Sequence, residues 1–137
     1  MKYVAVIDTN VVVSALITPN SNSEKIISYI EQGKIIPVYS VEIMDEYIEV
    51  LNRDKFHFSK QKIEKVIGII KERGRILNGT ETDEFFTDPS DIKFFEVALT
   101  ANIVQDSFLV TGNLKHFPKT VFVVNPAMMV RIVKTNK

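Results

Sequence analysis

The 137-residue sequence contains no cysteine, and this absence excludes several kinds of site. Without cysteine the chain cannot form disulfides, thiolate zinc sites or a cysteine nucleophile. No stretch approaches the ~18 apolar residues that a membrane-spanning helix needs, and no signal peptide precedes the first apolar run. These absences predict a cytoplasmic protein without a membrane segment. Internal repeats, linkers and low-complexity segments are also missing, so we expect a single domain over residues 1–137.

Net charge is also lacking, because 17 basic side chains balance 17 acidic ones, but the two signs are segregated along the chain. Residues 53–75 carry eight basic side chains against three acids, and residues 107–137 carry five basic side chains and no acid. The remaining segments are acidic. A basic rim around an acidic centre would suit a polyanionic substrate such as nucleic acid. Charge runs also commonly cover solvated helix faces, so charge alone does not decide between the two.

Short β-branched runs alternate with helical patterns along the chain. We expect strands at residues 3–7, 35–39, 75–77, 108–111 and 121–124. The expected helices cover residues 11–16, a segment from a Ser23 cap to Gly33, a segment from a Ser40 cap to Asn52, and residues 59–74, 88–101 and 126 onward. Strands separated by helices imply an α/β fold, with a parallel sheet covered by helices on both faces.

An aspartate directly after the first expected strand is the most informative residue. The apolar run of residues 3–7 leads into Asp8, Thr9 and Asn10. In open α/β folds, ligands bind at the carboxyl edge of the sheet, where this carboxylate would lie. Asp8 could instead cap the following helix, but Thr9 or Asn10 could do that as well. We therefore take Asp8 as a candidate for chemistry.

Three further acids are candidates to join it. On the helix that Ser40 caps, Glu46 borders the apolar stripe while the other acids lie opposite, so Glu46 either faces inward or is an ordinary boundary residue. Asp88 and Asp91 flank Pro89 in a helix start that needs no chemistry by itself. Asp88 is the better cap and Asp91 the better ligand candidate. Carboxylates that converge at a sheet edge are what a hard divalent cation needs.

A second polar turn follows the expected strand at residues 108–111. Gly112 would let the backbone approach a ligand or adopt a positive φ. Asn113 could be a neutral ligand, a water holder or a turn residue. His57 and His116 lack the spacing of metal ligands, so we expect surface or aromatic-flanked histidines.

Taken together, these segments resemble a PIN domain, and they occur in the right order over nearly the whole chain. The matching segments are residues 6–10, 45–47, 88–91 followed by Ala98, 109–113 and 116–118. The similarity is greatest to the VapC-like toxin components of prokaryotic toxin–antitoxin pairs. The resemblance implies a three-layer α/β/α PIN fold with a central parallel sheet of about five strands.

The resemblance also implies a ribonuclease that depends on Mg²⁺ or Mn²⁺. Asp8, Glu46 and Asp91 match the three core acidic residues of the family, as catalytic residues and metal ligands. The expected supporting residues are Thr9, Asn10, Asp88, Thr111 and Asn113. Because Asn113 stands where many PIN domains have a fourth aspartate, the number of bound ions stays open between one and two. The implied partners are RNA, a second copy of the chain in a homodimer and a protein antitoxin.

Two alternatives to a metal-dependent ribonuclease start from the same residues. A phosphatase of the haloacid-dehalogenase type also begins with a strand followed by aspartate, but it needs an acid two positions later, where this chain has Asn10. A catalytically decayed PIN-fold module that binds RNA or a partner is consistent with Asn113. Metal binding separates this module from the nuclease. The apolar face of the C-terminal helix, which includes Met129 and Val133, could pack in the core or form a dimer contact, and the core is the default expectation.

Overall fold

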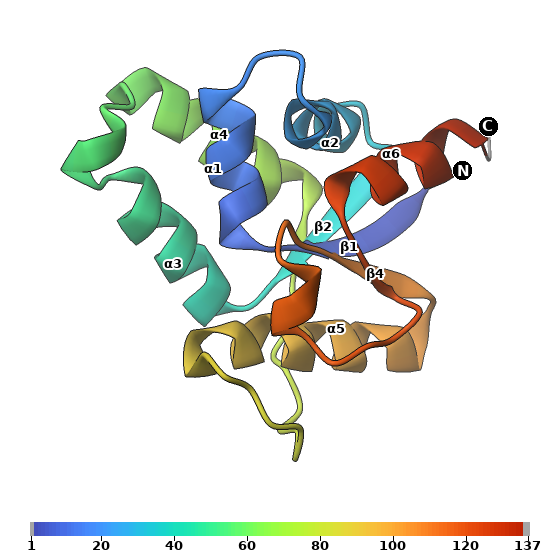
Figure 1. Cartoon of the computed structure of the whole chain (residues 1–137). Helices are drawn as coiled ribbons and strands as arrows, with labels where there is room; N and C mark the ends of the chain where they lie inside the picture. Colours follow the sequence, from blue (N-terminus) through green and yellow to red (C-terminus); the bar gives the residue numbers. More distant parts are fainter. Residues whose placement is uncertain (1, 136–137) are drawn as a thin grey trace.

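The computed structural model describes residues 2–135 and contains a five-stranded sheet (Figure 1). Residues 1, 136 and 137, the ends of the expected domain, lie outside the described part. The strands are β1 (Tyr3–Ile7), β2 (Ile35–Tyr39), β3 (Arg75–Ile76), β4 (Ser107–Val110) and β5 (Val123–Val124). They lie in the order β3-β2-β1-β4-β5, and every neighbouring pair is parallel. The expected α/β class and parallel sheet are confirmed.

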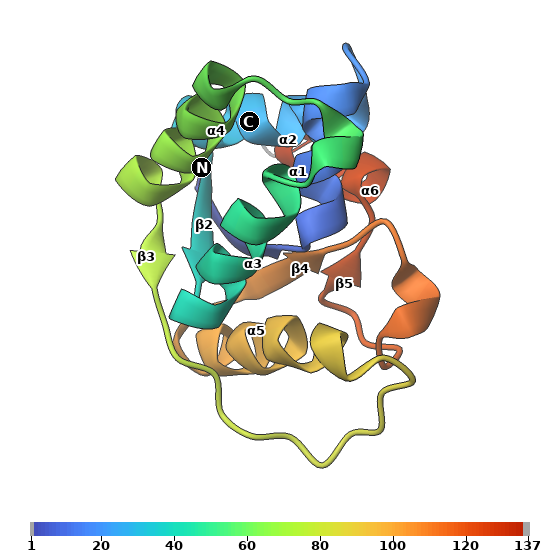
Figure 2. The same cartoon turned by 90° about the vertical axis from the view of Figure 1, so that its left-hand side faces the viewer.

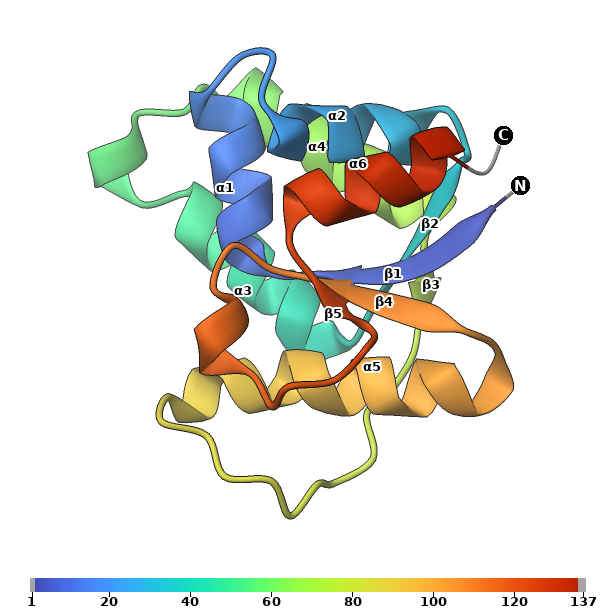
Figure 3. The same ribbon diagram turned by 45° about the vertical axis from the view of Figure 1, so that its right-hand side comes forward.

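Helices cover both faces of this sheet, as a three-layer fold requires. They are α1 (Thr9–Ile17), α2 (Asn22–Glu31), α3 (Val41–Leu51), α4 (Lys60–Arg73), α5 (Ile92–Val104) and α6 (Pro126–Thr135). Short 3₁₀ turns are η1 (Asp54–Phe56), η2 (Pro89–Asp91) and η3 (Leu114–His116). Figure 3 shows α5 below the strands and α1, α2, α4 and α6 above them. None of the helices within residues 2–135 combines the length and apolarity of a membrane span.

The central strands are buried on both faces, which explains their unbroken apolar sequences. Residues 4–7 of β1 and residues 109–110 of β4 are all buried in one continuous hydrophobic core. A parallel sheet sandwiched between helices favours such runs over an alternating pattern. The next residues along each strand, Asp8 and Thr111, therefore emerge together at the carboxyl edge of a rigid core.

Several expected element boundaries shift in the structure. Ser21, and not Ser23, caps α2: its hydroxyl accepts from the backbone N–H of Glu24 (3.1 Å), while Ser23 is buried inside the helix. Glu24 in turn accepts from the N–H of Asn20 (2.9 Å), so a second hydrogen bond holds the turn that Ser21 caps. Helix α5 continues to Val104, and β5 begins only at Val123.

A buried tyrosine fixes α3 against the end of β1. Tyr47 is fully enclosed in the core, and its hydroxyl donates to the carbonyl oxygen of Ile7. Burial raises the pKa of Tyr47 well above its ordinary value, so the hydroxyl keeps the proton that it donates. Because Ile7 precedes Asp8, this contact sets the distance between α3 and the carboxyl edge of the sheet. Figure 2 shows α3 in front of the strands at that edge.

We predict that Tyr47→Phe lowers the free energy of unfolding by about 1–3 kcal/mol, because it leaves a buried carbonyl oxygen without a donor. Tyr3→Phe is the matched control. The Tyr3 hydroxyl is buried and has no hydrogen-bond partner within residues 2–135, so removing it should leave stability unchanged or raise it. Urea denaturation of both variants measures the difference. Equal losses in the two variants would contradict the assigned role of Tyr47.

Candidate functional site

Asp8 lies at the junction of β1 and α1 with its carboxylate turned into the protein. It occupies the N-cap position of α1, yet its side chain makes no capping hydrogen bond. The carboxylate instead accepts from Thr111 Oγ1 (2.7 Å) and from Asn10 Nδ2 (3.3 Å), and the residue is only 6% exposed. Helix capping therefore does not account for this buried carboxylate.

The turn after β4 is tied to the start of α1 by side-chain contacts. Thr111 is fully buried, and its hydroxyl accepts from the backbone N–H of Asn113 (3.0 Å) while donating to Asp8. Asn10 Oδ1 accepts from the N–H of Gly112 (3.2 Å). Gly112 does not adopt a positive φ, so that part of the expectation is wrong. A Cβ atom at this glycine would lie 3.5 Å from Asn10 Oδ1, which is an ordinary contact.

Glu46 faces the start of α1 and the start of α5, although it borders the exposed side of α3. Its Oε2 accepts from the hydroxyl of Thr9, and its Oε1 lies 2.7 Å from Lys93 Nζ. The preceding residue, Asp45, is exposed. The side chain of Glu46 therefore points from α3 toward the other elements of the site and is not an ordinary solvated boundary residue.

Of the two acids before α5, Asp88 is a cap, and Asp91 is free of that role. Asp88 Oδ1 accepts from the backbone N–H (2.9 Å) and the hydroxyl (2.8 Å) of Ser90, and these bonds lower the pKa of Asp88. Asp91 makes no capping bond. Its Oδ2 is buried without a hydrogen-bond partner in the described part of the chain, with His116 Nδ1 3.4 Å away. Burial, and next the charge of Asp88, raise the pKa of Asp91.

The acids influence one another electrostatically even though they come from distant segments. Burial raises the pKa of Asp8 from 3.8 to about 6; the hydrogen bond from Thr111 opposes this shift, and the charges of Asp91 and Glu46 add to it. Asp91 is in turn affected by Glu46. Three carboxylates that disfavour each other's negative charge form a region where a cation is favourable.

Lys93 is a residue of this group that the sequence analysis missed. Its ammonium pairs with Glu46 and donates to the carbonyl oxygen of Ser90 (2.6 Å), with side-chain exposures of 18% for Lys93 and 25% for Glu46. A usable signal existed in the sequence. Lys93 is the second residue of α5, and the helix dipole disfavours a cation at a helix N-terminus unless an anion compensates it.

His116 is the second residue that the sequence analysis left outside the site. It was expected at the surface, and its side chain is indeed half exposed, but one ring nitrogen faces Asp91. Asn113, by contrast, is exposed, and its backbone is the part that contacts Thr111. The turn of η3 after β4 brings His116 back toward the acids, which residue spacing alone does not indicate.

The donor chemistry of the site fits a hard divalent cation. Within residues 2–135, no group of three or more His, Asp or Glu side chains is already arranged to hold an ion. The oxygens of Glu46 are taken by Lys93 and Thr9, whereas Asp91 Oδ2 is buried without a hydrogen bond and has only His116 Nδ1 nearby, at 3.4 Å. A buried carboxylate oxygen that accepts no hydrogen bond is costly in a protein interior unless a cation meets it. Carboxylate oxygens are the ligands that Mg²⁺ and Mn²⁺ prefer.

Comparison with known proteins identifies the class to which this fold and site belong. The model of the PIN domain family matches residues 4–115, so the chain belongs to the PIN domain family, as its sequence motifs predict. Members of this family are generally nucleases that use divalent metal ions. An uncharacterized protein of Methanocaldococcus jannaschii is 30% identical over 116 residues, which cover 82% of this chain and 72% of that protein. These matches do not distinguish VapC-like toxins from other members.

We predict that stability in EDTA falls as the pH rises through the range in which Asp8 ionises. The pKa of Asp8 is about 6 in the folded protein against 3.8 for an ordinary carboxyl group. Well below pH 3.8 the carboxyl is therefore protonated in both the folded and the unfolded protein. As the pH rises, ionisation costs more free energy in the folded protein than in the unfolded one. The loss should develop between about pH 4 and pH 7 and reach the order of 3 kcal/mol. Asp8→Asn should lack this decline and be more stable than wild type at pH 8. If the free energies of unfolding of wild type and Asp8→Asn change by the same amount with pH, the assigned role of Asp8 is contradicted.

We further predict that Lys93→Met destabilises the protein in EDTA by about 1–2 kcal/mol, because Glu46 loses a partly buried cation. Adding Mg²⁺ or Mn²⁺ should stabilise this variant more than wild type, since the ion no longer competes with an ammonium group. Lys60→Met is the control, because its pair with Glu64 spans 3.9 Å and is exposed at 89% and 64%, so its loss should cost less than about 0.5 kcal/mol. Thermal melts with and without metal decide the question. If Mg²⁺ or Mn²⁺ raises the melting temperature of wild type and Lys93→Met equally, Lys93 does not compete with the ion for Glu46.

Proposed function

We propose that this PIN domain is a Mg²⁺- or Mn²⁺-dependent endoribonuclease, and that Asp8, Glu46 and Asp91 hold the ion. The observation that carries the proposal is the buried oxygen of Asp91 that accepts no hydrogen bond, within a mutually repelling group of acids. These acids stand at the carboxyl edge of a parallel sheet, where ligands bind in open α/β folds. Membership of a family of nucleases gives the reaction class.

Neighbouring side chains would orient the acids and keep Asp91 from serving as a helix cap. Thr111 and Asn10 orient the carboxylate of Asp8, and Thr9 orients that of Glu46. Asp88 accepts from Ser90 and thereby caps η2, the turn that leads into α5, while the side chain of Asp91 makes no capping bond. When bound, the ion would supply Lewis acidity toward the phosphodiester and lower the pKa of an attacking water. No protein nucleophile is then needed.

RNA is the proposed substrate because basic segments flank the acidic group. Arg53 and Lys55 follow α3 on one side, and Lys115 and Lys119 follow β4 on the other. Cations beside the acids would neutralise the phosphates on either side of the one that reacts. Single-stranded or looped RNA is favoured, because unstacked nucleotides can be reached individually.

A toxin role completes the proposal and rests on the resemblance to VapC-like proteins. In that role the protein would cleave cytoplasmic RNA, form a homodimer and be neutralised by a protein antitoxin. Growth arrest on expression, relieved by co-expression of a neighbouring small open reading frame, tests the role. Light scattering of the purified protein tests the dimer.

We predict that wild type cleaves a mixed pool of structured RNA with Mg²⁺ or Mn²⁺, and that EDTA abolishes cleavage. Asp8→Asn, Glu46→Gln and Asp91→Asn should each reduce the rate at least about 100-fold, because each removes a charge that would hold the ion. Asp45→Asn is the matched control, since this exposed acid adjoins Glu46 on the same helix. Its rate should stay within about twofold of wild type.

Two outcomes of that experiment would overturn the proposal. Cleavage that survives Asp8→Asn would mean that another site, or a contaminating nuclease, is responsible. A folded wild type that shows neither cleavage nor stabilisation by Mg²⁺ or Mn²⁺ would favour the catalytically decayed binding module.

A further inference from the structure

A cleft of about 370 Å³ opens beside the acids, between α1, α3, η1 and η2. Glu46 and Ser90 line the end that adjoins the proposed metal site, and Arg53 and Phe56 line it as well. The volume falls in the range of roughly 300–1,000 Å³ that is usual for ligand clefts. The proposed function gives Arg53 a general role in neutralising phosphates but gives Phe56 none, so the aromatic part of the cleft has no assigned role. Figure 3 shows the segment between α3 and α4, which carries η1, projecting from the molecule.

An aromatic pair gives this segment a rigid surface. The ring of Phe56 stacks on that of Phe58, with 5.3 Å between centroids and 7° between planes. Both rings are half-buried and pack against the core, although the segment itself is an exposed connection. His57, between them, adopts the left-handed conformation (φ 53°), where the chain turns at the end of η1. Phe56 is therefore backed by a second ring and by the core while it still lines the cleft.

Two cations accompany the aromatic pair, and neither is committed to a strong partner. Arg53 pairs with Glu49 at 3.0 Å, and its Nε and Nη2 also donate to Glu49 Oε1 (3.4 and 3.1 Å), but the two side chains are 48% and 61% exposed. Such a surface pair contributes little to stability, so the guanidinium can turn to a phosphate at small cost. Lys55 is exposed, with its ammonium 5.1 Å from the centroid of Phe56. A base could replace this ammonium over the ring, and the ammonium could then meet a phosphate.

We propose that Phe56, Arg53 and Lys55 form a subsite for one unpaired nucleotide of RNA next to the reacting phosphate. The base stacks on Phe56, and the adjoining phosphate contacts Arg53 and Lys55. The subsite rests on the proposed function, because that function places the reacting phosphate at Glu46 and its neighbours. Stacking on an aromatic ring tolerates any base, so the subsite selects single strands rather than a sequence. A paired base inside a duplex cannot reach the ring.

The test compares binding and cleavage of a short single-stranded RNA by matched variants. Phe56→Leu keeps an apolar side chain but removes the aromatic face; Phe56→Tyr keeps the face. We expect Phe56→Leu to weaken RNA binding, measured by fluorescence anisotropy in EDTA, roughly 5- to 100-fold, and to raise KM similarly with kcat within about threefold. Phe56→Tyr should behave as wild type, and its melting temperature controls for folding.

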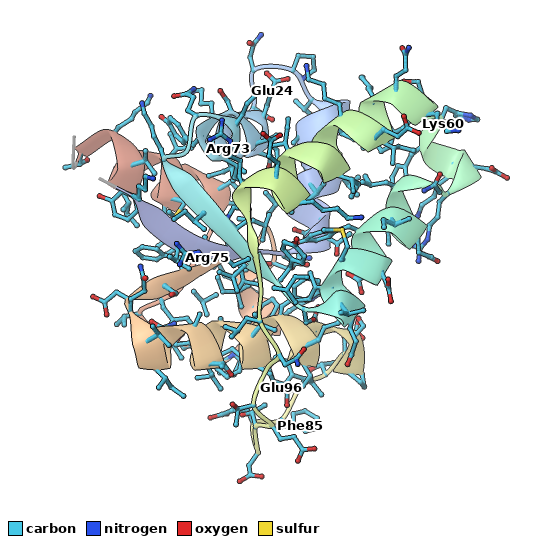
Figure 4. All side chains as sticks on the ribbon, turned by 180° about the vertical axis from the view of Figure 1, so that it is seen from behind. Glu24, Lys60, Arg73, Arg75, Phe85 and Glu96 are labelled. Atoms are coloured by element: carbon cyan, nitrogen blue, oxygen red, sulfur yellow. The ribbon has the colours of Figure 1, made fainter. Side chains whose placement is uncertain are left out.

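Charge variants test the phosphate contact separately. Arg53→Gln should weaken RNA binding. It should also reduce the slope of log affinity against log salt concentration by about one, the value for one lost phosphate contact. Arg75→Gln is the control, because Arg75, labelled in Figure 4, lines a different hollow together with Val4 and Ser107 near the amino ends of β1 and β4. It should leave both the affinity and the salt dependence of binding unchanged.

An abasic RNA identifies the stacked nucleotide directly. A single abasic nucleotide beside the cleavage position should weaken binding to wild type by the same factor as Phe56→Leu. It should not weaken binding to Phe56→Leu any further, because the two changes remove the same contact. Independent, additive effects would overturn the subsite.

The outcomes separate this subsite from the proposed nuclease. Cleavage by wild type with unchanged binding and KM in Phe56→Leu would overturn the subsite and leave the nuclease intact. Single-strand binding that depends on Phe56 without any cleavage would support the subsite and contradict the nuclease. Equal losses for single-stranded and duplex RNA would indicate a general electrostatic surface and refute stacking. Absence of both binding and cleavage would refute both proposals.

Discussion

The parallel pairing of β1 with β4 is the constraint on which the site depends. Ile7 pairs with Val110 in the ladder, so the residues that follow each strand, Asp8 and Thr111, must emerge side by side. A buried carboxylate needs donors, and Thr111 supplies one across a separation of 103 residues. A slip of one residue between these strands would move the hydroxyl away and turn buried side chains to the wrong face. The packed core therefore fixes the geometry of Asp8.

The acids at this edge illustrate a conflict between stability and function. Burial, and then repulsion from neighbouring acids, raise the pKa values of Asp8 and Asp91, which means that the folded protein resists the charge that a metal site requires. Lys93 relieves part of this conflict by pairing with Glu46. Such arrangements cluster at functional sites, because only a ligand compensates them fully. The strength of the opposing core contacts, including the one between Tyr47 and Ile7, allows the fold to tolerate them.

The cleft beside the acids would link cleavage at the acids to binding of the neighbouring part of the RNA. Helix α3 contributes to both, since Glu46 and Tyr47 lie within it and Arg53 follows its end. The same helix is thereby anchored to β1, supplies an acid and leads into the aromatic pair at Phe56. A rigid connection of this kind would hold a stacked base at a fixed distance from the acids, and it would do so without reading sequence.

The sequence by itself determined the alternation of strands and helices, because unbroken apolar runs and capped amphipathic segments are local signals. Short motifs in a fixed order also indicated the family, and the PIN domain model matches residues 4–115. Asp8, Glu46 and Asp91 could be picked out as candidates from their places at a strand end, beside an apolar stripe and at a helix start, and their role as ligands remains a proposal. The choice of Ser23 over Ser21 as a cap was wrong because two serines offered the same local chemistry, and the two hydrogen bonds of Glu24, with Ser21 and Asn20, distinguish them.

Only the tertiary structure decided which side chains meet. Lys93 reaches Glu46 from another helix, His116 returns to Asp91 through a turn, and Arg53 and Phe56 share a cleft with Glu46. The contacts of Lys93 and His116 join different elements of the chain, and their partners are set by strand order and helix packing rather than by local preference. Sequence patterns record which residues are buried and where elements begin. The distances between side chains of different elements are fixed only when the core has packed.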